Sequence, residues 1–345
     1  MTDPIALSGA PGSPYTRKML AVLRYRRIAY RLLPPSGSAL GVTPLDGLPQ
    51  AKVALLPTFY LPDETGALQA VTDSTPLIRR LEREHPGRSV IPTDPALAFL
   101  DELIEDYADE WLTKAMFHYR WAFTADADKA ASILPASRGY SIPDADLTER
   151  GRQFAERQIG RLGYVGSNAA TGPVIEASYA RFLTALDAVL REQPFILGAR
   201  PGACDFAVFG QLTQLAQFDP TPMALTLKIA PRVAAWTGLM EDQSGLEPKD
   251  SDWISPANPP AALIALLTEI GRVYPPLMLA NARAVATGAT LVEAVVDGQP
   301  WTQAPFPYQA KCLGWLRASH AALDPTAAET IDAVLEQTGC RVLFG

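Results

Sequence analysis

Short apolar runs and one helix-like stretch alternate at the start of the chain. The runs at 5–8 and 28–33 are typical of short buried strands. Between them, residues 13–27 carry apolar side chains at helical spacing. This stretch begins with Ser13-Pro14, which are favoured at the N-cap and the first helical position. The pattern predicts a β-α-β opening unit.

A hairpin and a closing helix follow in the pattern. Strand-like runs at 53–61 and 68–71 flank the turn residues 63–66, and a helix is predicted over 76–85. Residues 34–51 carry four prolines and three glycines and are predicted to form a long loop. The order β-α-β-loop-β-β-α predicts a small α/β layer of about 85 residues.

Helical spacing alone continues beyond a Pro/Gly-rich linker at 86–95, which predicts an all-helical second domain. The helices are predicted over 97–121, 147–162, 174–191, 204–218 and 230–240.

A third part begins after a joint rich in Pro, Ser and Asp at 246–258. Its first helix is predicted to break at Tyr274-Pro275-Pro276, because proline interrupts helical hydrogen bonding. A second helix to about 287, a hairpin with Asp297-Gly298 at its turn, and helices over 308–323 and 327–338 complete the chain. The predicted domains are 1–86, 95–245 and a mostly helical extension over 246–345.

Pro57 stands inside an apolar, strand-like run, where it cannot donate to a sheet ladder. An X–Pro bond also raises the odds of a cis peptide. We expect the N–H and C=O of Leu56 to face a groove unpaired, as an edge that accepts an extended peptide. Asp73-Ser74 then open a helix whose free N–H groups suit a carboxylate. These features predict a site for a small charged peptide; a bulge at Pro57 and simple caps at Asp73 and Ser74 are the alternatives.

Charge and cysteine content exclude other classes of function. A formal charge of −7 argues against nucleic acid or an anionic membrane as the main partner. The three cysteines, Cys204, Cys312 and Cys340, are too far apart to suggest a disulfide framework or a Cys-x-x-Cys site. We see no signal peptide and no apolar stretch of about 18 residues, so a cytoplasmic protein is expected.

Four motifs in this order resemble the glutathione transferase superfamily. They are Ser13–Lys18, Leu56-Pro57, Asp73-Ser74, and Phe195–Gly198 followed by Gly202–Phe206. The resemblance covers roughly residues 5–240 and implies a thioredoxin-like N-terminal domain, an all-α domain and a homodimer. It also implies a transferase that binds glutathione and promotes attack of its thiolate on a small electrophile.

The resemblance also implies a role for each motif. The Leu56 backbone would pair with the cysteinyl unit of glutathione, next to a cis Pro57. Ser74 would hold the γ-glutamyl carboxylate and Asp73 the amino group.

Ser13 would face the glutathione sulfur at the helix N-terminus, where a thiol pKa is lowered. Tyr15 is the alternative hydroxyl, and Ser13 as a mere helix cap is the plain alternative.

The chain departs from the family pattern at several points. Many relatives carry Cys where this chain has Ser13, so thiol–disulfide exchange by a protein cysteine is not expected. Gly202 replaces the usual Ser or Thr cap before Asp205. The extension has no counterpart in the two-domain form, which leaves a non-catalytic binding or assembly protein as the alternative function.

Two groups of side chains on the 97–121 helix have more than one interpretation. Tyr107 and Trp111 either pack in the core or line a pocket for an apolar co-substrate. In the resembled family an acidic residue of this helix can cross the dimer axis to the amino group of the ligand, and Asp101 is the candidate for that role here. The same helix carries an acidic run of Asp101, Glu102, Glu105, Asp106, Asp109 and Glu110. A solvated acidic face is the main interpretation of this run, and no metal site is predicted.

Overall fold

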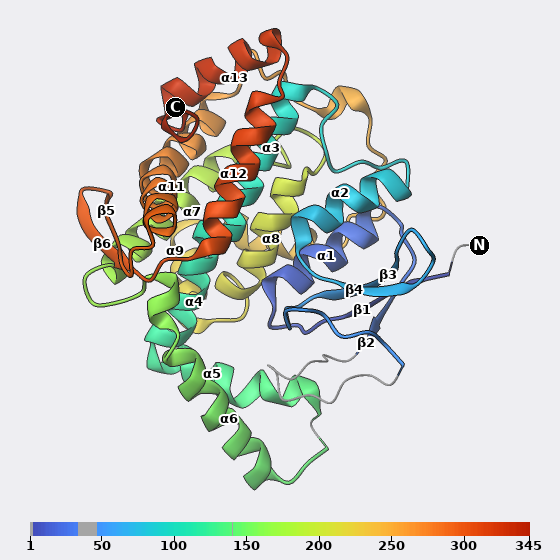
Figure 1. Cartoon of the computed structure of the whole chain (residues 1–345), viewed down its shortest axis with the longest axis vertical. Helices are drawn as coiled ribbons and strands as arrows, with labels where there is room; N and C mark the ends of the chain where they lie inside the picture. The colour runs from blue at the N-terminus through green and yellow to red at the C-terminus, as the bar shows by residue number, and fades with distance from the viewer. Residues whose placement is uncertain (1–2, 34–46, 140) are drawn as a thin grey trace.

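The N-terminal layer is a four-stranded mixed sheet in the order β2-β1-β3-β4 (Figure 1). The computed structural model describes residues 3–33, 47–139 and 141–345, so most of the predicted 34–51 loop lies outside the described residues. β1 pairs parallel with β2 and antiparallel with β3, and β3 pairs antiparallel with β4. The elements are β1 (Ile5–Ser8), α1 (Pro14–Tyr25), β2 (Tyr30–Leu33), β3 (Thr58–Pro62), β4 (Leu68–Val71) and α2 (Ser74–Glu84).

This layer confirms the predicted order of strands and helices and corrects one boundary. β3 begins at Thr58 instead of near residue 53. The reason is Pro57, which has no N–H to donate to the ladder. Figure 1 shows α1 and α2 on the sheet face that meets the helical part of the chain.

The middle of the described chain is helical throughout. A π-helical turn divides the predicted 97–121 helix into α3 and α4, and α5 and α9 were not predicted from the pattern. The elements are α3 (Pro95–Tyr107), η2 (Ala108–Leu112), α4 (Thr113–Ala122), α5 (Thr124–Ile133), η3 (Pro135–Arg138), α6 (Asp144–Ile159), η4 (Leu162–Val165), α7 (Gly172–Glu192), α8 (Ala203–Leu215), α9 (Pro220–Ile229) and α10 (Pro231–Leu239).

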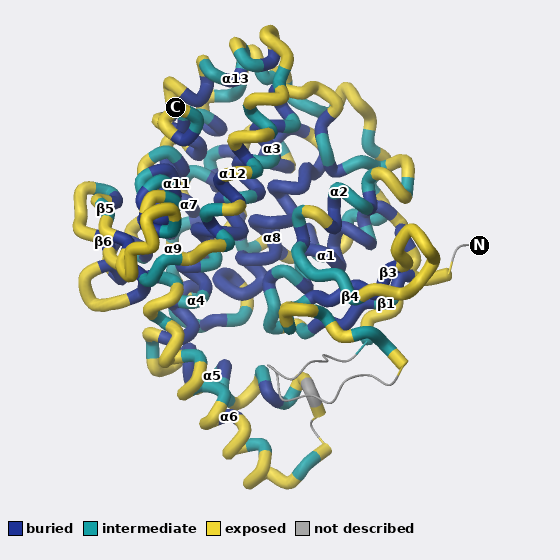
Figure 2. The backbone as a smooth tube through the Cα atoms, in the orientation of Figure 1, coloured by how far each residue is buried: buried dark blue, intermediate teal, exposed yellow. Residues whose placement is uncertain are grey.

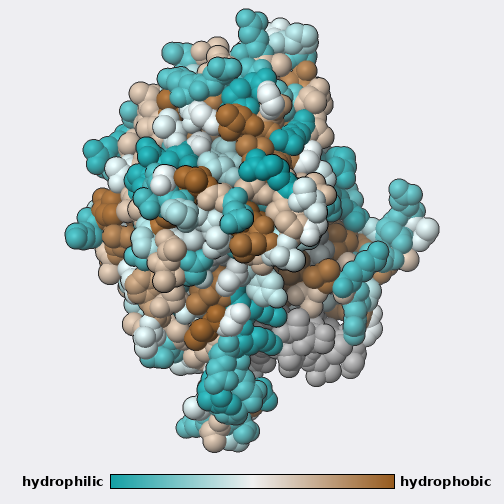
Figure 3. Space-filling view, turned by 60° about the vertical axis from the view of Figure 1, so that its left-hand side comes forward, coloured by the Kyte–Doolittle hydropathy of each residue, from teal (hydrophilic) through white to brown (hydrophobic). Residues whose placement is uncertain are grey.

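The core of the molecule is organised around α8, in which every residue is buried (Figure 2). α8 packs against α1 of the N-terminal layer and α3 of the helical part. In contrast, α6 buries only Gly151. The projecting end that carries α6 is hydrophilic in Figure 3.

The extension has the predicted β-hairpin and five helical segments. They are η5 (Asp250–Asp252), α11 (Ala261–Thr287), β5 (Val292–Val296), β6 (Gln299–Gln303), α12 (Pro307–Ala321), α13 (Pro325–Thr338) and η6 (Arg341–Leu343). α12 and α13 both pack against α3, with α12 extending toward the N-terminal layer (Figure 1). The domain limits 1–86, 95–245 and 246–345 stay a prediction.

The predicted break at Pro275-Pro276 is wrong, because α11 runs through both prolines as one helix. An interior proline costs about 3 kcal/mol. Packing of α11 against α7, α12, α13 and β5 offsets this cost. α11 is also long and apolar enough to cross a membrane, contrary to the sequence prediction, but 61% of that window is buried inside the protein.

A carboxylate from another helix replaces the missing cap of α8. Asp101 of α3 accepts the Cys204 N–H at 2.9 Å, while Asp205 accepts the N–H groups of Gly202 and Ile196. A β-carbon at position 202 would lie 2.4 Å from the Asp101 carboxylate oxygen. Glycine therefore makes room for the substitute cap, and Asp101 points into the protein rather than across a dimer axis.

We expect Asp101 to make stability fall as the pH rises from about 4 to 8. Burial raises the pKa of Asp101 to about 8, and the nearby Glu105 adds to the rise. At a pH between the pKa of Asp101 in the unfolded state and its pKa in the folded state, the folded protein holds a proton that the unfolded protein has lost. Raising the pH through this range therefore favours unfolding. Asp101→Asn keeps the acceptor oxygen without this titration.

Urea unfolding at pH 5, 6, 7 and 8 tests this prediction. With each increase in pH, the free energy of unfolding of Asp101→Asn should rise relative to that of the wild type. Asp324→Asn, at the N-cap of α13, is the control. Parallel curves for Asp101→Asn and the wild type would contradict the prediction.

Candidate functional site

The backbone before β3 forms the edge that the sequence singled out. The Leu56–Pro57 peptide bond is cis. The Leu56 carbonyl accepts the Ser13 hydroxyl at 3.2 Å, so the prediction that this carbonyl is unpaired is wrong. No hydrogen bond joins the Leu56 N–H to another residue within the described ranges. Leu56 is half-buried, and an unpaired N–H beside a strand is the group that strand addition by an extended peptide requires.

Ser13 is a helix cap and also a hydroxyl at this edge. It is the N-cap of α1, and its oxygen accepts the Thr16 N–H at 3.2 Å. The same hydroxyl donates to Leu56. The plain cap interpretation is therefore true, and it leaves a rotatable O–H at the helix N-terminus, beside the open edge.

Tyr15, the alternative hydroxyl, points away from the edge into the helical part. It donates to the Asp109 carbonyl at 2.8 Å. Burial raises the pKa of Tyr15 well above its ordinary value, and the charges of Asp109 and Glu110 raise it further. Its hydroxyl thus stays protonated and joins α1 to η2.

The start of α2 lies at the same end of the sheet, because β3 and β4 are antiparallel and β4 leads into Asp73. Asp73 precedes the helix with φ = +86°, a conformation rare for residues other than glycine. Ser74 is buried and accepts Lys18 Nζ at 3.2 Å. Asp73 accepts the hydroxyl of Tyr308 at 2.5 Å. A residue of the extension therefore reaches the predicted glutathione site.

Lys18 is an important residue that the sequence analysis missed. Its ammonium group is 1% exposed and meets Glu105 at 2.7 Å and Asp109 at 2.6 Å, besides Ser74. Burial would lower the pKa of Lys18, but the two carboxylates outweigh burial and raise it. The sequence pattern that could have identified Lys18 is a lysine on the apolar face of α1 together with six carboxylates in an otherwise apolar segment.

The predicted solvated acidic face is wrong, because these carboxylates are largely buried between α1, α2 and the extension. Glu105 also accepts Thr75 and Arg79. Burial raises the pKa of Asp109 to about 6 despite Lys18. Asp106 accepts the hydroxyl of Tyr274, and burial raises the pKa of Asp106 to about 7.

Neighbouring residues of the π-helical turn η2 contact different parts of the chain. The Asp109 carboxylate accepts Lys18, and the Glu110 carbonyl accepts Gln309 of the extension at 3.2 Å. The turn therefore joins the N-terminal layer and the extension through neighbouring residues.

Two family models match the chain on either side of α3. The model for the glutathione S-transferase N-terminal domain matches residues 7–89, and that for the C-terminal domain matches residues 151–238. The chain belongs to the glutathione transferase superfamily. The N-terminal match contains Ser13, Leu56, Pro57, Asp73 and Ser74.

Solved structures of this superfamily show likeness at low identity. A family member from Pseudomonas fluorescens with two glutathione molecules bound is 14% identical over 69% of this chain and 92% of its own, with a TM-score of 0.43. A transferase from Methylobacterium radiotolerans in complex with glutathione sulfonate is 19% identical over 70% and 92%, with a TM-score of 0.41. Poplar glutathione transferase F1 is 16% identical over 70% and 95%, with a TM-score of 0.43. No curated protein matches the chain.

In this transferase-family chain, Tyr107 and Trp111 are core residues. Both are at most 1% exposed. Trp111 donates to Ser178 at 2.8 Å and its ring lies 5.4 Å from that of Trp301 of the extension. Their assignment to a co-substrate pocket is therefore wrong, and the core interpretation holds.

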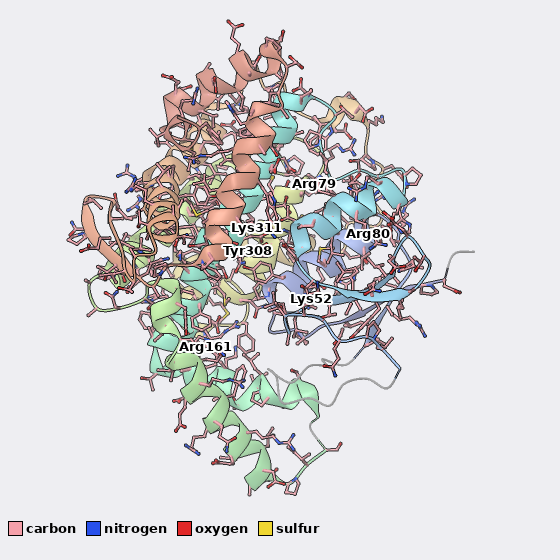
Figure 4. The ribbon with its side chains drawn as sticks, in the orientation of Figure 1. Lys52, Arg79, Arg80, Arg161, Tyr308 and Lys311 are labelled. Carbon is pink, nitrogen blue, oxygen red and sulfur yellow. The ribbon has the colours of Figure 1, made fainter. Side chains whose placement is uncertain are left out.

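The two arginines of α2 that follow the candidate site are already paired, Arg79 with Glu105 and Arg80 with Glu84. Figure 4 labels Lys52, Arg79 and Arg80 on the N-terminal layer, and Tyr308 and Lys311 on the part of α12 that faces it. Within the described ranges no three side chains of metal-ligating type gather to hold an ion.

Proposed function

We propose that this protein is a glutathione-dependent transferase that promotes attack of the glutathione thiolate on a small electrophile. The observation that carries the proposal is the edge at cis Pro57, where the Leu56 N–H is free and the Ser13 hydroxyl reaches the same residue. Membership in the superfamily supports glutathione as the ligand.

We assign glutathione binding to the groups at this end of the sheet. The free Leu56 N–H and its carbonyl pair with the cysteinyl unit, as in strand addition. Ser74 accepts from Lys18, so its own proton remains to donate to the γ-glutamyl carboxylate above the α2 N-terminus. Asp73 receives the amino group of the ligand, to which a carboxylate offers charge-assisted hydrogen bonds.

Thiol activation is assigned to Ser13. Its hydroxyl turns from the Leu56 carbonyl to the sulfur when the peptide occupies the edge, and it donates to the thiolate. The N-terminus of α1 adds positive potential. Together they lower the thiol pKa, so that more of the nucleophilic form is present at neutral pH. The thiolate then bonds to the electrophilic carbon, and the leaving group departs with the displaced electron pair.

The second candidate function is a non-catalytic binding or assembly protein on the same fold. It is favoured by the Tyr308 contact with Asp73, because a tail that closes the site permanently would exclude glutathione. The two candidates differ in whether glutathione binds at all.

Glutathione binding by the full chain tests the proposal. We expect retention on immobilised glutathione, a calorimetric signal at millimolar glutathione or below, and turnover with a general aryl halide. No binding at millimolar concentration would overturn the proposal in favour of the non-catalytic protein.

A homodimer, a cytoplasmic location and a role in detoxification belong to the same proposal and come from the family resemblance. In this chain α12 and α13 cover α3, and Ser319 donates to Glu102 across that contact. A dimer would therefore use a surface outside the covered part of α3. Light scattering on the eluted protein separates a monomer of 37.2 kDa from a dimer.

A further inference from the structure

Tyr308 brings a residue of the extension to the amino end of the candidate glutathione site. It lies in the first turn of α12, and its hydroxyl donates to Asp73 Oδ2 at 2.5 Å across 235 residues of sequence. Figure 4 labels Tyr308 on the side of α12 toward the N-terminal layer. Neither matched family domain includes this segment.

Hydrogen bonds on both sides of Tyr308 hold it in place. The fully buried Asn281 of α11 bonds both the N–H and the C=O of Phe306, at 2.8 and 2.9 Å. After Tyr308, the buried Gln309 donates to the Glu110 carbonyl at 3.2 Å. The tyrosine is therefore anchored to α11 and to η2, which is expected of a fixed contact rather than of a mobile tail.

Asp73 keeps capacity for a ligand while Tyr308 is bound. Within the described ranges only Tyr308 bonds its carboxylate, through Oδ2. A carboxylate accepts about four hydrogen bonds in all. An ammonium group can therefore bind Oδ1 without displacing the tyrosine. Burial and the Asp73 carboxylate raise the pKa of Tyr308, so its hydroxyl remains a donor.

We propose that Tyr308 is a positioning residue for the free amino group of glutathione, which it serves by holding the Asp73 carboxylate in place. The inference rests on the proposed function. The half-buried Asp73 has no cap bond to its own helix, so the tyrosine sets the orientation of its carboxylate. The extension thereby makes the site selective for ligands whose amino group is unmodified.

Calorimetric titration of the full chain with glutathione and with N-acetylglutathione tests this role. Tyr308→Phe keeps the ring and removes the donor. We expect it to weaken glutathione binding about 10-fold, the scale of one hydrogen bond to a charged group. Binding of N-acetylglutathione should be weak in the wild type and unchanged in the variant, because this ligand offers no ammonium to Asp73.

Ser319→Ala is the matched control, because it removes another hydroxyl-to-carboxylate bond from α12, at 3.1 Å to Glu102. It should change neither affinity. In an Asp73→Asn background, Tyr308→Phe should cause no further loss. Both outcomes separate positioning from a general effect on the fold.

Three results would overturn the inference. Equal glutathione affinity in Tyr308→Phe and the wild type would show that the contact positions nothing. Tighter binding in the variant would show that the tyrosine competes with the ligand. A wild type that binds no glutathione would overturn the proposed function together with this inference, whereas the first two results leave the proposed function intact.

Discussion

Replacing Lys18 by methionine is expected to lower the free energy of unfolding by about 3–5 kcal/mol, the cost of removing one partner of a buried ion pair. The ammonium donates to Glu105, Asp109 and Ser74, and both the lysine and Glu105 side chains are 1% exposed. Methionine fills similar space but leaves buried carboxylates without their cation. α1 then loses its polar link to α2, α3 and η2.

The loss of stability in Lys18→Met should depend on pH. Burial alone would raise the pKa of Glu105, but Lys18 and Arg79 outweigh burial and lower it. A carboxylate with a lowered folded pKa stabilises the protein above its unfolded pKa, and that contribution is lost as the pH falls through the folded value. The difference between Lys18→Met and the wild type should therefore shrink in acid.

Urea unfolding at pH 7 and at acidic pH measures both effects. Arg152→Ala is the control, because Arg152 pairs with exposed glutamates of its own helix, α6, and such pairs contribute about 0.5 kcal/mol. A Lys18→Met loss as small as that of Arg152→Ala would contradict the buried-network argument.

Replacing Ser13 by alanine is expected to lower kcat/KM for glutathione conjugation roughly 100-fold, the effect of removing one preorganised donor to a developing or resident anion. The variant loses the hydroxyl that bonds Leu56 in the free protein and that is proposed to bond the sulfur in the complex. The pKa of the bound thiol should rise toward the ordinary value of about 8.5.

Ser13→Thr and Tyr15→Phe are the matched controls. Threonine keeps both a hydroxyl and a cap for α1, so it should retain most activity. The Tyr15 hydroxyl is bonded to Asp109, so its loss should leave the thiol pKa unchanged. The measurements are steady-state turnover and the pH titration of thiolate absorbance in the complex. Loss in Tyr15→Phe with full activity in Ser13→Ala would reverse the assignment.

Local features of the chain were predictable because a few neighbouring residues decide them. Ser13-Pro14 begins a helix and Asp297-Gly298 turns a hairpin whatever lies elsewhere in the fold. Pro57 indicated a gap in the sheet ladder and raised the odds of a cis bond, although the strand was predicted to begin before it. The motifs around these positions were enough to indicate the superfamily.

Long-range packing decided the rest. No local rule predicts that α11 continues through Pro275-Pro276. The helix is stabilised there by packing against other elements, not by the residues next to the prolines in the chain. The carboxylates of α3 and η2 resemble a solvated face until Lys18 and the extension are brought against them.

The sequence by itself determined the fold class, the strand edge at Leu56-Pro57 and the hydroxyl of Ser13, since each depends on residues adjacent in the chain. Only the tertiary structure decided that Lys18 is buried among carboxylates and that Tyr308 reaches Asp73. Contacts between residues this far apart form only when whole elements dock, and docking is determined by the complete core rather than by any segment of it.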